Sequence, residues 1–494
     1  MQVAKPRLSF WQIINMNVGF FGIQYSFGLQ QSAVNPIYDF LGAKPDEIPW
    51  LNLAGPLTGL IIQPIIGALS DKTWHPKFGR RKPFFLIGAI TCSIALFLFP
   101  FSSTLWMAAG LLWVLDAGNN TAMEPYRAFV ADKLDATQQP TGFQAQSFFT
   151  GFGQTLANVS LFIFPAIIIG YTGKIPNWVF ASFFVGAVCS IASVLWSMRT
   201  TPEIPPTDEE LAEIRKKNEG MPHPVIQFFL SILTTIISYI AMVVLIIPEI
   251  FSKGTIRKIM GSLNNNKITK SLFAQNIEIF EAIMVMPKVM WQLALVYLFQ
   301  WYALFCYWQN SSKSIALSLY NATPENKELY EKAVSITGLV NGWYNIVTFL
   351  VAFGLVGFAK KYSPKWVHFF CLLMAGIGFI AFPFITQKTL LFVAISGFGV
   401  GWASMMGIPY LMVVKDIPKE RYGVYMGVIN MMIVIPMFIQ TISFGYIMKH
   451  FLSNNPGNAV LLAGVLLLIA AACTSLIKTT KITDDVVMPA GGGH

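Results

Sequence analysis

The segment LWMAAGLLWVLDAGNNTAMEPYRAFVADK (residues 105–133) decides the fold class of this chain. It is apolar up to Leu115 and then carries one carboxylate, Asp116, near its middle. A helix needs about 20 mainly apolar residues to cross a bilayer, and an acid at that depth costs several kcal/mol. No other apolar segment places an acid or a base so near its centre. We therefore interpret residues 105–133 as a membrane helix and Asp116 as a candidate functional residue.

The composition extends this interpretation to the whole chain. Of 494 residues, 54% are hydrophobic and only 12% are charged, whereas a soluble protein carries roughly a quarter charged residues. The net charge of +10 raises the question of nucleic acid. However, the basic residues lie in short loops between apolar segments, where they orient a chain in a membrane. We therefore expect the lipid bilayer as a partner and exclude nucleic acid.

Twelve apolar segments are long enough to cross a bilayer. Six lie near 10–34, 49–70, 83–101, 104–131, 143–170 and 177–198, and six more near 289–318, 333–359, 365–385, 389–413, 423–448 and 457–477. We predict an all-α polytopic membrane protein with two six-helix bundles around a central cavity, an architecture in which transporters bind substrate near the midplane. The predicted units are an N-terminal bundle 1–199, a central loop 200–284, a C-terminal bundle 285–480 and a disordered tail 481–494.

Orientation follows from the Lys and Arg residues of the short loops, which accumulate on the cytoplasmic side. With the N-terminus inside, basic clusters at 77–82, 360–365 and 415–421 are cytoplasmic, and a thinner outer set includes Lys44 and Lys313. Both halves then face the same way, with both termini cytoplasmic. The expected location is a cell membrane, either a plasma membrane or a bacterial inner membrane.

The central loop contains one further apolar segment, near 224–251. It is long enough to cross the membrane, but both of its flanks are basic, and a single crossing would invert the second half against its own positive loops. We favour a helix that lies along the inner face, or a re-entrant hairpin, over a true extra span.

The polar residues of segment 105–133 share one helical face. Asp116, Asn120, Glu124 and Arg127 recur at steps of four and three residues. Asn120 can hydrogen-bond the acid, and Glu124 can form a closing ion pair with Arg127. Two alternatives remain: Glu124 and Arg127 snorkel at the helix end, and Asp116 makes a structural hydrogen bond between helices.

Amide and aromatic side chains on other segments predict a polar cavity. Amides offer both donors and acceptors, and together with aromatic planes they suit a neutral polyhydroxylated ligand. The alternative for each aromatic residue is packing or an interfacial anchor. The substrate-binding candidates are Gln24, Gln31, Gln154, Asn158, Gln300, Trp301, Asn341 and Trp343.

The loop GALSDKTWHPKFGRRKPF (67–84) combines glycines, an aspartate and paired arginines in a fixed order. Gly67 would let two helix ends approach closely. Asp71 would accept hydrogen bonds from a neighbouring helix N-terminus and pair with the arginines. The alternative is a basic loop that only sets topology. The candidate cytoplasmic gate residues are Gly67, Asp71, Gly79, Arg80 and Arg81.

This loop resembles the cytoplasmic gating loop of major facilitator transporters. Residues 10–200 and 285–480 resemble the glycoside–pentoside–hexuronide:cation symporter branch, in particular sucrose and maltose:proton symporters of plants with their animal and bacterial relatives. The stretches that carry this resemblance are FGIQYSFGLQQSAVNP (21–36), IPWLNLAGPLTGLIIQPIIGALSD (48–71), LDAGNNTAMEPYRAFVADK (115–133) and MGVINMMIVIP (426–436).

The resemblance implies that Asp116 is the proton-coupling acid and that Arg127 is the arginine of the NNxxxxPxR segment. Two positions depart from the family pattern. Met437 stands where a glutamine is usual, and FCYWQN (305–310) lacks the acids of the plant proteins.

We therefore predict proton-coupled symport of a small neutral sugar, a disaccharide such as sucrose or maltose, by alternating access in a monomer. The expected coupling ion is H⁺, with Na⁺ as the alternative, and no cofactor or metal is expected. The chain shows no HExxH, no GxSxG and no His–Asp pair within the spans, so we do not expect an enzyme. The other functions considered are a sodium-coupled or uncoupled glycoside transporter and a nutrient sensor with a transporter fold.

Overall fold

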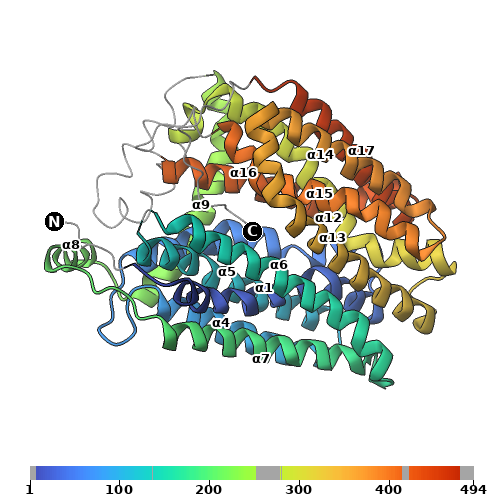
Figure 1. Ribbon diagram of the computed structural model, residues 1–494, viewed down its shortest axis with the longest axis horizontal. Helices are drawn as coiled ribbons and strands as arrows, with labels where there is room; N and C mark the ends of the chain where they lie inside the picture. Colours follow the sequence, from blue (N-terminus) through green and yellow to red (C-terminus); the bar gives the residue numbers. More distant parts are fainter. Residues whose placement is uncertain (1–6, 136, 252–278, 280, 414–421, 479–494) are drawn as a thin grey trace.

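Two helical bundles form the protein, as the computed structural model shows (Figure 1). The structure describes residues 7–135, 137–251, 279, 281–413 and 422–478. The predicted disordered tail, the basic cluster at 415–421 and most of the second half of the central loop lie outside the described residues.

Within the part of the chain that the structure describes, six long helices build the N-terminal bundle. Their bounds are α1 (Phe10–Phe40), α3 (Ala54–Asp71), α4 (Lys82–Leu98), α5 (Leu105–Lys133), α6 (Gln139–Ile167) and α7 (Asn177–Thr200). Local sequence begins several of them: Ser9 forms a capping box with Gln12 before α1, and the Thr104 hydroxyl accepts from the N–H of Met107 before α5. The short helices α2 (Ile48–Leu51) and η1 (Phe99–Phe101) border α3 and α4.

Six long helices also form the C-terminal bundle. They are α12 (Lys288–Tyr320), α13 (Lys327–Tyr362), α14 (Pro364–Ala381), α15 (Lys388–Val413), α16 (Tyr422–His450) and α17 (Pro456–Ser475), with the short η2 (Phe382–Phe384) after α14. One detail departs from a purely helical chain. The strands β1 (Tyr171–Thr172) and β2 (Ile175–Pro176) pair in an antiparallel hairpin, because Gly173 adopts a positive φ at the turn.

Among the described residues, nine helices are long and apolar enough to cross a membrane. The helices α1, α5 and α6 are as long, but they are less apolar because amides and the Asp116 carboxylate interrupt them. Large apolar side chains cover the outer surface: Trp106 is 80% exposed and Ile169 is 87% exposed. Such a surface requires lipid around it. The number of crossings, twelve, stays a prediction.

The two bundles meet along several helices. The helix α6 packs against α13, α1 contacts α12 and α13, and α3 contacts α16. At Gly338 in the α6–α13 contact, an added Cβ would lie 2.7 Å from the carbonyl oxygen of Asn158. The bundles therefore touch through small residues and polar side chains.

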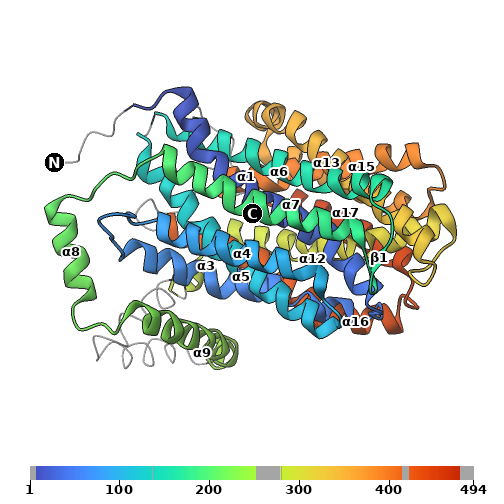
Figure 2. The same cartoon turned by 90° about the horizontal axis from the view of Figure 1, so that it is seen from below.

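The segment between the bundles forms α8 (Asp208–Asn218) and α9 (Pro224–Phe251). Helix α9 packs against α3, and Figure 2 places both α8 and α9 at the end of the molecule opposite β1. The exposed residues Val225, Phe229 and Leu233 recur at four-residue steps, whereas Gln227 and Thr234 are buried. The apolar face of α9 over residues 224–238 thus points away from the protein. Whether α9 spans the membrane, lies along it or re-enters stays a prediction.

Candidate functional site

A cavity of about 140 Å³ lies between the two bundles. One wall is polar and comes from the N-terminal bundle, with Gln30, Gln31, Asn35, Asn52, Gln63, Asp116, Asn120 and Gln154. The opposite wall comes from α12, α15 and α16, with Trp301, Phe305, Trp308, Gln309, Trp402, Ile433, Val434 and Met437. A ligand in this cavity would therefore meet hydrogen-bonding groups on one side and indole rings on the other.

Asp116 is the only ionisable side chain among the described residues that line the cavity. It is 1% exposed. Its Oδ1 accepts a hydrogen bond from Gln30 Nε2 at 2.6 Å, whereas Oδ2 has no partner among the described residues. A buried carboxylate oxygen without a partner is costly. Oδ2 is therefore the atom at which a proton or a ligand hydroxyl would bind.

Asn120 does not bond the carboxylate, contrary to the prediction. Its Nδ2 donates to the backbone carbonyl of Asp116 at 2.9 Å and to Thr58 Oγ1 at 3.0 Å, and its Oδ1 accepts from Gln63 Nε2 at 2.6 Å. The carbonyl one turn earlier on the same helix is the nearer acceptor, so the side chain turns back to it. Asn120 therefore positions α3 against α5.

Two residues of this wall, Gln30 and Gln63, were not predicted. Gln30 reaches Asp116 from α1, and Gln63 joins α3 to Asn430 of α16 through a 3.2 Å hydrogen bond. Gln30 lies next to the candidate Gln31 in the sequence, but it was not among the predicted contacts. Only the crossing of α1 and α5 shows that Gln30 faces the carboxylate.

Aromatic rings form the second wall through edge contacts. The ring centroids of Trp301 and Trp402 lie 5.7 Å apart, and those of Trp308 and Trp402 lie 5.6 Å apart. Phe305 contacts Trp308 at 5.7 Å. The indole of Trp308 also interacts with the hydroxyl of Tyr344 on α13. This wall thus offers apolar ring faces to a ligand.

Three of the eight predicted substrate contacts, Gln31, Gln154 and Trp301, line the cavity. Two others support them from behind: Gln24 accepts a hydrogen bond from Gln154 Nε2 at 2.9 Å, and Asn158 donates to the backbone carbonyl of Gln154 at 2.8 Å. The pattern of helical faces thus identified the right helices, but the depth of each side chain depends on packing.

The other three predicted contacts lie elsewhere. Asn341 bridges the bundles, because it accepts from Tyr307 at 2.8 Å and donates to Ser32 at 2.9 Å. Gln300 is within 3.2 Å of the buried His368 ring. Trp343 is 39% exposed and donates to Ser396 of α15 at 2.8 Å. Trp343 therefore packs on the outside of the bundle, as the packing alternative proposed.

The buried Arg81 guanidinium organises the loop between α3 and α4. It pairs with Asp71 at 2.6 Å and with Asp132 of α5 at 2.9 Å, and it also donates to Ser70 Oγ at 2.6 Å. Burial lowers the pKa of Arg81, but the two carboxylates outweigh that effect and raise it overall. Arg81 therefore stays charged and ties α3 and α5 together. On α5 itself, Glu124 and Arg127 form the predicted ion pair at 3.8 Å.

A carboxylate that was not predicted, Glu203, caps the N-terminus of α4. It accepts from the backbone N–H groups of Arg80, Arg81 and Lys82 at 2.8, 2.9 and 2.8 Å. Asp71 was predicted for this role, but it pairs with the Arg81 side chain instead. Glu203 lies more than a hundred residues further along the chain, so no local pattern could have found it.

The two glycines of this loop differ in their importance. Gly79 has φ +82°, and an added Cβ would lie 2.5 Å from the carboxyl carbon of Glu203. Only glycine fits there, because the backbone conformation and the capping carboxylate both exclude a side chain. At Gly67 an added Cβ would meet Glu124 at 3.9 Å, which is ordinary contact. The prediction of a close helix approach at Gly67 is therefore wrong.

Lys313 was predicted to lie in an outer loop, and this prediction is wrong. It lies within α12, its side chain is 4% exposed, and its Nζ lies 3.3 Å from Oδ1 of Asp39 on α1. The carboxylate of Asp39 also accepts a hydrogen bond from the Tyr330 hydroxyl of α13. Asp116 is therefore not the only charged residue that is buried in a long helix.

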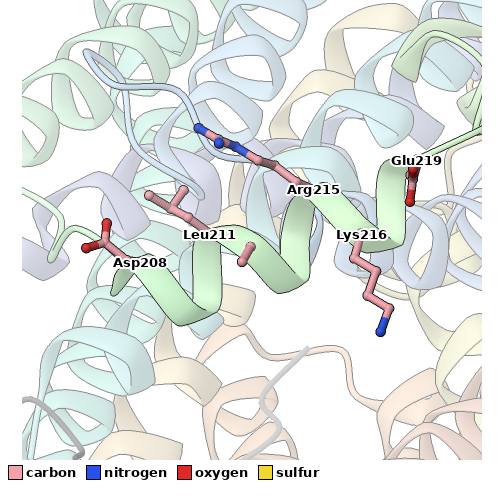
Figure 3. A pocket seen from close by; sticks show the side chains of 6 residues that line it. Asp208, Leu211, Arg215, Lys216 and Glu219 are labelled. Carbon is pink, nitrogen blue, oxygen red and sulfur yellow. The ribbon is translucent and has the colours of Figure 1, made fainter.

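A second hollow lies beside α8 (Figure 3). It is lined by Asp208, Leu211, Ala212, Arg215, Lys216 and Glu219. Figure 3 shows that its charged side chains point in different directions along a single helix. A ligand site needs convergent polar groups in an enclosed space, so we do not assign a function to this hollow.

Residues 16–441 match the model of the Major Facilitator Superfamily. The chain therefore belongs to the Major Facilitator Superfamily. This finding confirms the predicted family and helical fold. Two solved structures have a similar fold. The xylose transporter XylE from E. coli has 13% identity, a TM-score of 0.60 and coverage of 96% of this chain and 99% of that one. The nucleoside transporter NupG has 12% identity, a TM-score of 0.60 and coverage of 94% of this chain and 98% of that one.

Curated relatives include sucrose transport proteins of plants. Sucrose transport protein SUT5 of Oryza sativa is 23% identical over 96% of this chain and 88% of its own length. Sucrose transport protein SUC3 of Arabidopsis thaliana is 31% identical over 32% of this chain and 28% of its own length. These relatives are transporters and not enzymes, in agreement with the prediction.

Proposed function

We propose that this protein is a secondary active transporter that carries a small neutral sugar together with a proton. The observation that supports this most is the Asp116 carboxylate, which has an unpartnered oxygen in a cavity between two bundles and faces a wall of indole rings. Sucrose transport proteins among the relatives support a disaccharide such as sucrose or maltose as the substrate.

The chemistry of the lining favours a neutral polyhydroxylated ligand. Amides can donate to and accept from hydroxyl groups, and the apolar face of a sugar ring can stack on indole rings. No Lys or Arg occurs among the described lining residues, so an anionic ligand would have no counter-charge and would face the Asp116 carboxylate. The two unlike walls suit a ligand with one polar edge and one apolar face.

Proton binding at Asp116 would couple the ion to the sugar. A neutral carboxyl can donate to a sugar hydroxyl through Oδ2, and it can move with the closing bundles without burying a charge. An ionised Asp116 would bury a charge when the bundles close, and the desolvation cost of that charge disfavours closure around the site. A membrane potential of roughly 150 mV supplies ~3.5 kcal/mol per proton, which allows about two to three decades of sugar accumulation.

The size of the cavity supports alternating access. Its volume is about 140 Å³, whereas pockets for drug-sized ligands measure about 300–1,000 Å³. A disaccharide therefore enters only when the two bundles move apart. We infer that the end with the Arg81 loop and α8 is cytoplasmic, because basic loops stay inside. Both termini are then cytoplasmic in a cell membrane, and a monomer holds the complete site.

Uptake by the purified protein in liposomes tests this function. Labelled sucrose, maltose and glucose are offered with an inward proton gradient, with an inward sodium gradient and with neither. Proton-driven accumulation of a disaccharide is expected. Accumulation driven only by sodium would refute proton coupling, and binding without uptake under any gradient would indicate a sensor.

The same assay tests Asp116. Asp116→Asn should retain sugar exchange at equal concentrations on both sides and lose accumulation against a gradient. The matched control is Asp208→Asn, because Asp208 is an exposed acid at the start of α8. Accumulation by Asp116→Asn at the native level would refute the assignment.

A further inference from the structure

A buried ion pair joins the two bundles away from the central cavity. Lys313 Nζ on α12 lies 3.3 Å from Asp39 Oδ1 on α1, and the two side chains are 4% and 3% exposed. The second oxygen of Asp39 accepts a hydrogen bond from the hydroxyl of Tyr330 on α13, which is also buried. We refer to Asp39, Lys313 and Tyr330 as the outer gate.

The outer gate lies at the end of the bundles opposite α8. Asp39 is in the last turn of α1, and Tyr330 is in the first turn of α13. At the same end, Trp178 of α7 donates to Glu331 of α13 at 3.0 Å. Trp178 closely follows β1 in the chain, and Figure 2 shows β1 and α8 at opposite ends of the molecule. The contacts of Asp39 with Lys313 and Tyr330, and that of Trp178 with Glu331, therefore join one bundle to the other.

We propose that the outer gate closes the outer mouth of the transport path and that its ion pair must separate in every transport cycle. This inference rests on the proposed alternating access. The face of α1 that leads to the gate supports it, because Gln31 and Asn35 line the cavity and Asp39 follows one turn later. Separation of α1 from α12 at the gate would connect the cavity to the outer side along polar residues.

The physical chemistry of a buried ion pair gives this gate two stable positions. When it is closed, the pair is desolvated, but each charge faces the other and Tyr330 satisfies the second carboxylate oxygen. When it is open, water hydrates both charges. An intermediate with one charge buried alone is strongly disfavoured. Removal of one partner should therefore shift the protein toward the open position, in which the remaining charge reaches water.

Labelling from the outer side measures this shift without any substrate. Ser32 of α1 is 4% exposed and lies between the cavity residues Gln31 and Asn35 in the sequence, about two turns before the gate, so Ser32→Cys reports access through the outer mouth to a membrane-impermeant maleimide. Lys313→Met should raise the labelling rate of that cysteine at least about tenfold. The reversed pair, Asp39→Lys with Lys313→Asp, should restore slow labelling. Ser312→Cys repeats the measurement from α12.

The control is a second ion pair at the same end. Lys332 and Glu328 pair at 2.7 Å on the surface of α13, where their side chains are 53% and 81% exposed. Lys332→Met should leave the labelling unchanged. Equal labelling of both reporters with and without Lys313→Met would overturn the gate, as would fast labelling in the reversed pair. Because the assay needs neither sugar nor proton gradient, loss of the proposed function would not alter its outcome.

Discussion

Replacement of Glu203 by alanine should loosen the start of α4. The carboxylate accepts three backbone N–H groups at 2.8–2.9 Å, and hydrogen bonds to charged groups contribute about 1.5–3 kcal/mol each. The sum of the three contributions is an upper bound, because Glu203 is partly exposed and water can replace part of the lost hydrogen bonding. Favourable interaction with the helix N-terminus adds about 0.3–1 kcal/mol. We therefore expect a local loss of about 2–3 kcal/mol.

Hydrogen exchange measures this loss directly. A loss of 2–3 kcal/mol corresponds to roughly 30- to 150-fold faster exchange in a peptide that covers residues 79–85. The control is Glu209→Ala, which removes an exposed acid from the first turn of α8 and should leave that peptide unchanged. Unchanged exchange in Glu203→Ala would refute the capping role.

A conservative variant separates charge from shape. In Glu203→Gln, one side-chain oxygen can still accept from Arg81 and Lys82, but the amide nitrogen then faces the N–H of Arg80, and two donors cannot pair. Exchange should therefore rise to a value between those of the native protein and Glu203→Ala. Exchange equal to the native value in Glu203→Gln would show that charge and the third acceptor do not matter.

Three further outcomes follow from the site. Asp116→Asn should lose accumulation while retaining exchange, as measured by uptake in liposomes. Trp308→Ala removes a ring that lines the cavity, so sugar affinity should fall about fivefold, for a ring contact of about 1 kcal/mol, in a tryptophan fluorescence titration. Gly338→Ala would place a Cβ 2.7 Å from the carbonyl oxygen of Asn158, so it should lower the thermal stability and slow transport. The control is Gly354→Ala, which has open space around the added Cβ and should change neither property.

Much of the candidate site could be inferred from periodicity alone. The four-residue spacing of Asp116 and Asn120 correctly placed both in the cavity wall, and the amide pattern of α1 and α6 identified Gln31 and Gln154. Periodicity gives the face of a helix but not the depth of each side chain. For that reason Trp343 was selected as a ligand contact, although it packs against Ser396 outside the cavity.

Hydrophobic length, the spacing of polar residues and the basic loops determined that this chain is a helical membrane protein with an acid at its centre, because transfer into lipid depends on local composition. Tertiary structure decided which groups that acid and the other charges meet. Gln30 beside Asp116, Glu203 at α4 and Lys313 beside Asp39 come from distant parts of the chain. Such pairs depend on how helices cross, and the short-range pattern of a sequence carries no record of those crossings.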